Sequence, residues 1–359
     1  MVVIGIDAHK ATHTLAAADP GGRKLGELTV QATPAGHIKA LDWARREFGT
    51  DVVWGVEDCR TLTHRLERDL LDTGQRVVRV PPHLMARARA SARTRGKSDA
   101  IDALAVARAV IREPDLPIAS HDDVSREFKL LVDRRDDLVA FRTAVMNRLL
   151  WRVHELDPAQ TPKTGTLHTY KQQEALRSWL VTQPGLVAEL AVDELADLKV
   201  LTMQINALER RITARVGAIQ SSLLGLRGCA ALTAAKVIGE TAVVSRFRSE
   251  AAFARHAGVT PTPHSSAGKS VQHRGSRFGN RQLNLALYRI AMMQIQRGGP
   301  SEAYYRKRRD GGDSHASALR HVERRVARKV FGCLRSDHLK RAAGDDIPCG
   351  TKPLTVNAR

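Results

Sequence analysis

The N-terminal 112 residues alternate between short apolar runs and stretches with helical spacing. The segments THTLAAAD and KLGELTVQAT flank the turn Pro20-Gly21-Gly22, which is the pattern of an antiparallel hairpin. Residues 34–47 and 64–74 have the spacing of amphipathic helices. Three further apolar runs are typical of strands: VVIGID at 2–7, DVVWGVED at 51–58 and QRVVRV at 75–80. Strands first and strand–helix alternation afterwards predict an α/β domain with a mixed sheet.

The rest of the chain is mostly helical in pattern. Apolar residues recur at threes and fours in residues 124–156 and 194–220, which predicts two long helices that pack on each other or across a dimer. The hairpin at Gly228 offers backbone N–H groups to a phosphate or simply lets two helices pack. The predicted organisation is an α/β domain at 1–112, a helical connector at 113–222, a mainly α C-terminal domain at 223–340 and a disordered tail at 341–359.

The net charge of the chain indicates the kind of partner that it binds. The formal net charge of +19 is far above the ordinary range, and such an excess repels itself unless a polyanion neutralises it. DNA or RNA is therefore the expected partner. The four cysteines form no CxxC pair, which argues against a zinc site or a disulfide framework. No apolar run reaches the length of a membrane span, so we expect a soluble, cytoplasmic protein and no membrane partner.

Four acidic residues occupy positions where they could share one site. Asp7 and Glu57 end two apolar runs, and Asp99 and Asp102 lie three apart on one face of a predicted helix. The strand order is that of a ribonuclease H-like sheet. Four carboxylates in one pocket repel each other unless cations relieve them, and hard oxygen ligands suit Mg²⁺ or Mn²⁺. Two such ions can hold the attacking and leaving oxygens of a phosphodiester.

Each acid also has a purely structural interpretation. Asp7 can cap the turn after its strand, and Asp58 competes with Glu57 as a ligand. Asp99 can serve as a helix N-cap, with Asp102 in the dipole-favoured first turn. Taken singly these interpretations are favoured; taken together, in this strand order and in so basic a chain, the metal site is favoured.

The same residues resemble a known family. GIDAHK, VED and KSDAIDALAVA are similar to the DEDD-type RuvC-like domain of the IS-one-ten (Piv-type) insertion-sequence transposases. The blocks LRGCAALTAAKVIGE, RFRSEAAFARHAGVTP and HSSAGKSVQHRGSRFGNRQLNLAL resemble that family's second domain. The resemblance covers residues 1–335, although the central helices match in pattern only. This chain departs from the family at Asp58-Cys59-Arg60, where Ala-Thr-Gly is usual, and at Ala267, where glycine is usual.

The resemblance implies a transposase that cleaves and rejoins DNA. It implies that Asp7, Glu57, Asp99 and Asp102 bind two divalent metal ions, and that Ser266 is the nucleophile that joins covalently to DNA. Because Ala267 intervenes before Gly268, Ser265 is a second candidate. The family also implies a homo-oligomer, a dimer or tetramer, in which the serine of one protomer works at the metal site of another. It further implies a guide RNA encoded by the element.

The residues themselves support the serine only in part. A serine hydroxyl needs a base or a metal to become a nucleophile. Four cations near Ser266 could hold a scissile phosphate: Lys269, Arg274, Arg277 and Arg281. From the residues alone, a plain phosphate-binding loop would rank first.

Three other interpretations compete with the transposase. Tyr304 and Tyr305 invite comparison with tyrosine recombinases, but adjacent aromatic residues on a basic helix more often pack. A RuvC-like nuclease or junction resolvase would hydrolyse DNA with metal-activated water and would keep its activity without Ser266. A non-enzymatic nucleic-acid-binding protein would be indifferent to Mg²⁺ and to loss of Asp7 or Asp102.

Overall fold

The computed structural model divides the chain into two compact units, Met1–Asp122 and Asp123–Arg359. It describes residues 1–57, 60–81, 84, 98–120, 123–163, 165–260, 262–264, 272–274 and 279–343, without the side chains of 60–61, 262–264 and 272–274. Among these residues, no helix combines the length and apolar character needed to cross a bilayer.

The first unit is built on a five-stranded mixed sheet in the order β3-β2-β1-β4-β5. β1 to β3 form an antiparallel meander, whereas β4 and β5 run parallel to β1. This topology confirms the predicted ribonuclease H-like, RuvC-like α/β fold. The elements are β1 (Val2–Ala8), β2 (Thr12–Ala18), β3 (Lys24–Gln31), α1 (Pro34–Phe48), β4 (Val52–Glu57), α2 (Arg60–Asp72), β5 (Arg76–Val80) and α4 (Asp99–Arg112).

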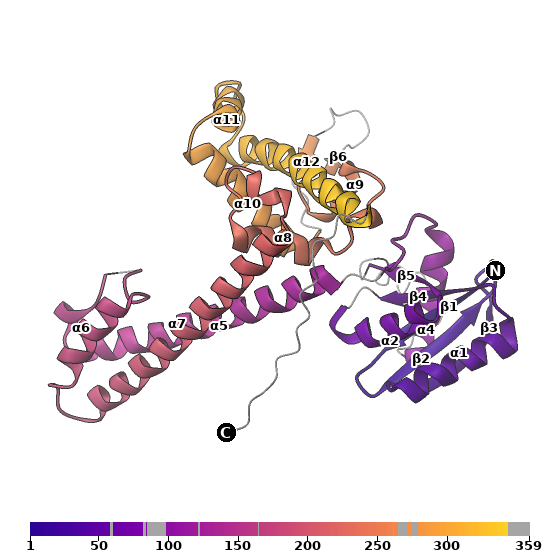
Figure 1. The fold of residues 1–359 in the computed structure, drawn as a ribbon, viewed down its shortest axis with the longest axis horizontal. Coiled ribbons are helices and arrows are strands. Elements are labelled where there is room, and N and C mark those ends of the chain that lie inside the picture. The colour runs from indigo at the N-terminus through magenta and orange to yellow at the C-terminus, as the bar shows by residue number, and fades with distance from the viewer. Residues whose placement is uncertain are drawn as a thin grey trace. The chain divides into compact units, whose positions relative to one another are not determined.

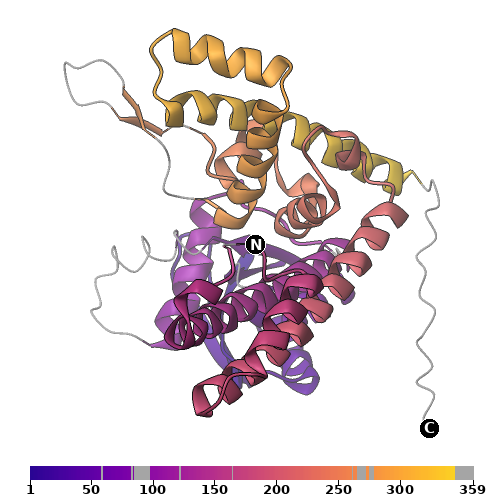
Figure 2. The same ribbon diagram turned by 90° about the vertical axis from the view of Figure 1, so that its left-hand side faces the viewer.

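The sheet is covered on both faces, as Figures 1 and 2 show. Alternate residues of the central strands, such as Ile4 and Ile6, pack with α1 and α2 in one core cluster. The opposite face carries Gly5 and Gly55, which are partners in the β1–β4 register. A Cβ at Gly5 would lie 2.1 Å from the carbonyl oxygen of Ala103, so glycine lets α4 lie directly on the sheet. α4 is therefore pressed against the strand ends that carry the candidate acids.

The second unit begins with a long helical hairpin. Its elements are α5 (Asp123–Leu156), α6 (Tyr170–Leu180), α7 (Leu186–Ala218), α8 (Ala231–Thr241), α9 (Glu250–His256), β6 (Thr262–His264), β7 (Gln272–Arg274), α10 (Arg281–Gln296), α11 (Pro300–Asp310) and α12 (His315–Ala342). The start of α5 packs with the end of α7 in one core cluster, and the end of α5 packs with the start of α7 in another. The two long helices are therefore antiparallel, and they pack on each other within one chain, which is one of the two arrangements expected.

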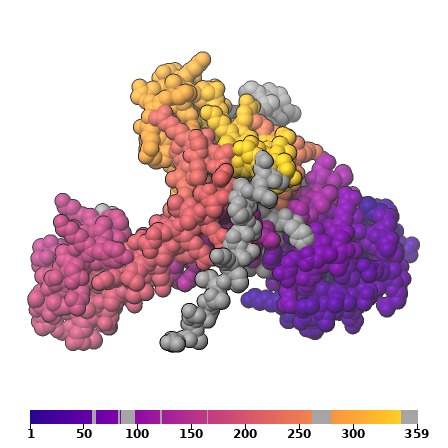
Figure 3. Space-filling model, in the orientation of Figure 1, coloured from indigo at the N-terminus to yellow at the C-terminus, as the bar shows by residue number. Residues whose placement is uncertain are grey.

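The two core clusters occupy opposite ends of this hairpin. α6 lies with the second cluster, away from α8–α12, and forms a separate end of the unit in Figure 3. α7 begins at Leu186, earlier than the predicted residue 194, because the positive φ of 91° at Gly185 ends the preceding turn there. The first cluster joins Phe128 and Ile212 of the expected connector to residues after 223. The boundaries of the expected connector (113–222) and C-terminal domain (223–340) stay a prediction. Helix α12 ends at Ala342, two residues into the expected tail 341–359.

Candidate functional site

Asp7 and Glu57 lie at the carboxyl ends of adjacent parallel strands. The β1–β4 register pairs Ile6 with Val56, so the residues that follow stand side by side. Because side chains alternate along a strand, Asp7 and Glu57 share the face of Gly5 and Gly55, against which α4 packs. Asp7 is largely buried, with 15% of its side chain exposed. The fold thus directs both strand-end acids toward one helix.

The N-terminus of α4 brings the second pair of acids. Ser98 is the N-cap residue, and its side chain accepts a hydrogen bond from the backbone N–H of Ile101 at 3.3 Å. The alternative that Asp99 is the cap is therefore wrong, because Ser98 has that role. Asp99 is exposed, whereas Asp102 is buried with 6% exposure. Capping by serine leaves the Asp99 carboxylate available to the strand ends.

The structure brings two of the four acids, Asp7 and Asp99, close together with a histidine. Ligand atoms of Asp7, His9 and Asp99 all lie within 4.8 Å of one another. Burial raises the pKa of Asp7, the neighbouring His9 opposes this, and the charges of Asp102 and Asp99 raise it further. The carboxylate of Asp7 is therefore close enough to both acids of α4 to be affected by their charges. The strand register places Glu57 beside Asp7. Such a concentration of negative charge is stabilised by a cation.

His9 is a member of this cluster that the sequence analysis missed. Its Nε2 lies 3.1 Å from Oδ2 of Asp7 and 3.5 Å from Oδ1 of Asp99. A neutral imidazole can bind the same metal ion as the two carboxylates, and a protonated one can stand in for the cation's charge. The signal was present as a histidine two residues after a strand-end aspartate, just past the end of β1 at Ala8.

The candidate nucleophile and most of its neighbours lie outside the described residues: Ser265, Ser266, Lys269 and Arg277. Arg274 ends β7, and its side chain is likewise not described. Arg281 is the exposed first residue of α10. The roles assigned to these residues stay predictions.

Two other expected features have structural explanations. Gly228 has a φ of 84°, and a Cβ there would lie 3.0 Å from the Ile290 carbonyl oxygen, so its glycine serves helix packing against α10. Tyr304 packs under the guanidinium of Arg325, and the hydroxyl of Tyr305 lies 2.6 Å from Nδ1 of His315. Both tyrosines pack against the second unit's core, as the packing interpretation expected.

Comparisons with known proteins fit both halves of the chain. Residues 4–156 match a family model described as a transposase, and residues 220–306 match the transposase IS116/IS110/IS902 family. An uncharacterised 44.8 kDa protein of insertion element IS116 from Streptomyces clavuligerus is 27% identical, over 94% of this chain and 95% of the relative. A 42 kDa protein of IS900 from Mycobacterium paratuberculosis is 24% identical, over 93% and 95%. The mini-circle putative transposase for IS117 of Streptomyces coelicolor is 26% identical, over 93% and 94%.

Among solved structures, Thermus thermophilus RuvC in complex with a Holliday junction substrate is similar over 33% of this chain and 99% of its own, at 18% identity and a TM-score of 0.26. The first transposase model ends with α5 and the second begins just after α7, in chain order, and the relatives align over nearly the whole length. The chain therefore belongs to the IS110 family of insertion-element transposases, enzymes of DNA transposition and recombination.

Proposed function

We propose that this transposase cleaves and rejoins DNA strands by attack of Ser266 on a phosphodiester, assisted by divalent metal ions that Asp7, Glu57, Asp99 and Asp102 hold. The observation that carries the metal half is the convergence of Asp7, His9 and Asp99 within 4.8 Å, next to the buried Asp102. The donors are mostly hard oxygens, which fit Mg²⁺ or Mn²⁺. When bound, a pair of such ions would polarise the phosphate and neutralise its developing charge.

The serine step conserves bond energy. The Oγ–P bond forms while the P–O bond to the leaving deoxyribose breaks, the hydroxyl proton passes to a base, and the leaving oxygen takes up a proton. Attack of a hydroxyl of another strand on the phosphoserine reverses these events and rejoins the DNA. No ATP is needed, because one phosphodiester replaces another. Lys269, Arg274, Arg277 and Arg281 would hold the phosphate through charge-assisted hydrogen bonds.

We extend the proposal to the partners that the family resemblance implied. The protein works as a homo-oligomer in which Ser266 of one protomer acts at the acids of another, in the bacterial cytoplasm on nucleoid DNA. A guide RNA from the element's noncoding flank pairs with donor and target DNA. The formal charge of +19 supports a second polyanion in the complex. Recombination of a plasmid-borne element should disappear when the flank is deleted and return when it is transcribed in trans.

The decisive experiment uses protein purified from cells that transcribe the native flank, mixed with labelled linear DNA that carries the gene's flanking sequence. Wild type should form a protein–DNA adduct that survives denaturing electrophoresis. Ser266→Ala should form none, and Ser265→Ala serves as the matched control. If Ser266→Ala still nicks this DNA in Mg²⁺, the enzyme hydrolyses like a resolvase. If Ser265→Ala alone abolishes the adduct, the nucleophile is Ser265.

A further inference from the structure

We propose that Asn280, held by the buried Glu240 and its partner Lys129, joins the two ends of the segment that contains Ser266 in a narrow neck and so positions the nucleophile. This inference rests on the serine mechanism proposed above. It concerns the described residues on either side of the segment, at 256–258 and 279–284, and the side chains that tie them to α8 and α5.

The two ends of the segment meet backbone to backbone. Gly279 has a φ of 115°, a conformation that favours glycine. A Cβ at Gly279 would lie 2.6 Å from the backbone nitrogen of Gly258, so no larger residue fits there. The next residue, Asn280, donates its backbone N–H to the His256 carbonyl at 2.6 Å. Residues 256–258 and 279–280, on either side of the segment, therefore meet in one narrow neck.

Asn280 joins this neck to two other elements. Its Oδ1 accepts hydrogen bonds from the backbone N–H groups of Gln282 at 3.0 Å and Leu283 at 2.9 Å, which caps α10. Its Nδ2 donates to Oε2 of Glu240 on α8 at 2.7 Å. Aspartate or serine could make the cap, but an aspartate could not donate to Glu240. The Asn280 amide does both, because its oxygen accepts and its nitrogen donates.

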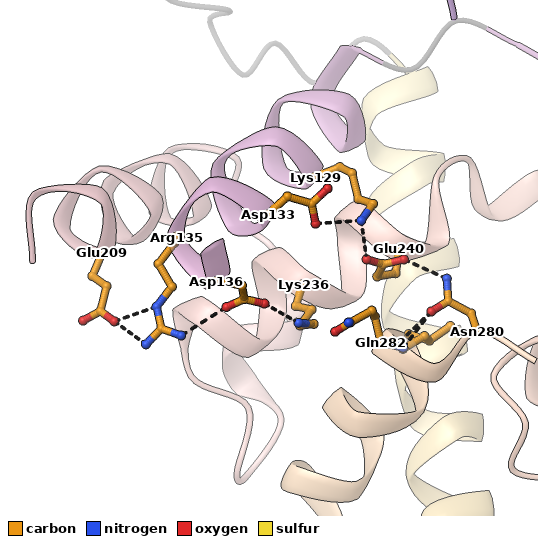
Figure 4. Close-up of polar contacts among 10 residues, drawn as sticks. Lys129, Asp133, Arg135, Asp136, Glu209, Lys236, Glu240, Asn280 and Gln282 are labelled. Atoms are coloured by element: carbon orange, nitrogen blue, oxygen red, sulfur yellow. Dashed lines mark hydrogen bonds and ion pairs between the residues drawn. The ribbon is translucent and has the colours of Figure 1, made fainter. Parts of the chain in front are cut away.

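Glu240 is anchored in turn by α5. Its side chain is 7% exposed, and its Oε1 lies 2.8 Å from Nζ of Lys129, which also contacts Asp133 at 2.7 Å. Burial acts to lower the pKa of Lys129, but hydrogen bonds to Asp133 and Glu240 outweigh it and raise that pKa, so the ammonium persists. Figure 4 shows the chain of contacts from Asp133 through Lys129 and Glu240 to Asn280.

The helices that carry these groups are in close contact. A Cβ at Gly239 would lie 2.8 Å from the backbone nitrogen of Lys129, so α8 approaches α5 directly beside the ion pair. One turn into α10, Asn284 donates to the Ala257 carbonyl at 3.0 Å. The neck is thus fixed from both sides, and displacement of Asn280 would move both ends of the serine-bearing segment.

The same figure contains a matched control. Lys236 of α8 lies 2.6 Å from Asp136 of α5, which contacts Arg135, and Arg135 in turn contacts Glu209 of α7. This second ion chain crosses the same α5–α8 interface, but its contacts lead to α7 and not to the neck. Asp136→Asn therefore removes a comparable interhelical ion pair and should leave the serine in place.

The test compares Asn280→Asp, the double variant Asn280→Asp with Glu240→Gln, and Asp136→Asn in the adduct assay at saturating flanking DNA. Asn280→Asp keeps the cap but sets two carboxylates against each other. We expect its adduct formation to slow by about tenfold or more, as misplacement of a reacting group does. In the double variant the new amide at position 240 can donate to the new carboxylate at position 280, and the rate should return to within about threefold of wild type. Asp136→Asn should lower the melting temperature and leave the rate unchanged.

The inference is overturned if Asn280→Asp forms adduct at the wild-type rate, if the double variant is no faster than the single one, or if Asp136→Asn slows the reaction as much. Ser266→Ala in the same assay separates the two proposals. If the adduct depends on Ser266 but not on Asn280, only the neck proposal fails. If the adduct persists without Ser266, the serine mechanism itself fails.

Discussion

Charged side chains are arranged differently in two regions of the molecule: the acidic end of the sheet in the first unit and the α5–α8 interface in the second unit. In the interface, acids and cations alternate, as in the series Glu209, Arg135, Asp136 and Lys236. At the sheet end, Asp7 instead lies near Asp99 and Asp102, and burial together with the charges of these two acids raises its pKa. Alternating charges stabilise a fold, whereas gathered like charges destabilise it until a cation binds. The contrast favours a structural role for the interface network and supports the proposed cation site at the sheet end.

The largest expected effect is at Asp7. Asp7→Asn removes a carboxylate from the gathered set, so in the absence of divalent ions the protein should melt at a higher temperature than wild type. Activity should fall by on the order of a thousandfold, as when one group that stabilises a transition state is removed. Calorimetry in EDTA measures the change in melting temperature, and the adduct assay in Mg²⁺ measures the loss of activity. A variant that is both less stable and fully active would show that the acids are structural.

Lys129→Met tests the α5–α8 interface, where acids and cations are paired. It removes the ammonium partner of the buried Glu240, which keeps its hydrogen bond from Asn280, and should cost about 2 kcal/mol of unfolding free energy at neutral pH. Calorimetry at pH 7 should show a lower melting temperature for the second unit's transition, and Asp7→Asn should leave that transition in place. Equal shifts of one shared transition would show that the two units unfold together.

Glu323 on α12 is an acid of the second unit in which burial dominates. Burial raises its pKa to about 7, against the opposing charge of Arg320. Below its unfolded pKa of 4.5 the carboxyl is protonated in both states, so it has no effect on stability. As pH rises from 4.5 to about 7 the unfolded state loses this proton while the folded state keeps it, so stability falls progressively, by about 3 kcal/mol at most, and levels off above pH 7.

Glu323→Gln should therefore match wild type in urea unfolding at low pH and become the more stable protein at pH 8. The difference should open between pH 4.5 and 7, the interval between the unfolded and folded pKa values. If the stability difference between Glu323→Gln and wild type were the same at all pH values, glutamine would act through packing, and burial would not raise the pKa of the Glu323 carboxyl.

The sequence predicted local features of both regions and missed those that depend on tertiary contact. Alternating apolar runs specify the strands, and an acid at the end of each of two runs is visible in the chain, so the strand-end positions of Asp7 and Glu57 could be predicted. His9 was overlooked because its role depends on a turn that carries its ring back to Asp7 and Asp99. The pairing of Glu240 with Asn280 joins residues 40 positions apart, and no periodicity signals it. The cap at Ser98 shows how one neighbour decides between two uses of an aspartate.

The smallest expected effect concerns exposed cations. Arg281 begins α10 beside the neck and is the proposed phosphate contact whose side chain the structure describes, whereas Arg306 pairs with Glu302 at 2.5 Å. Arg281→Ala should reduce the slope of log affinity against log salt by about 0.9, the value for one lost phosphate contact on duplex DNA. Arg306→Ala, which removes the same charge, should change the slope by less because its guanidinium is already occupied. Equal slopes for the two variants would mean that DNA responds to net charge alone, and the assignment of Arg281 to the phosphate would be wrong.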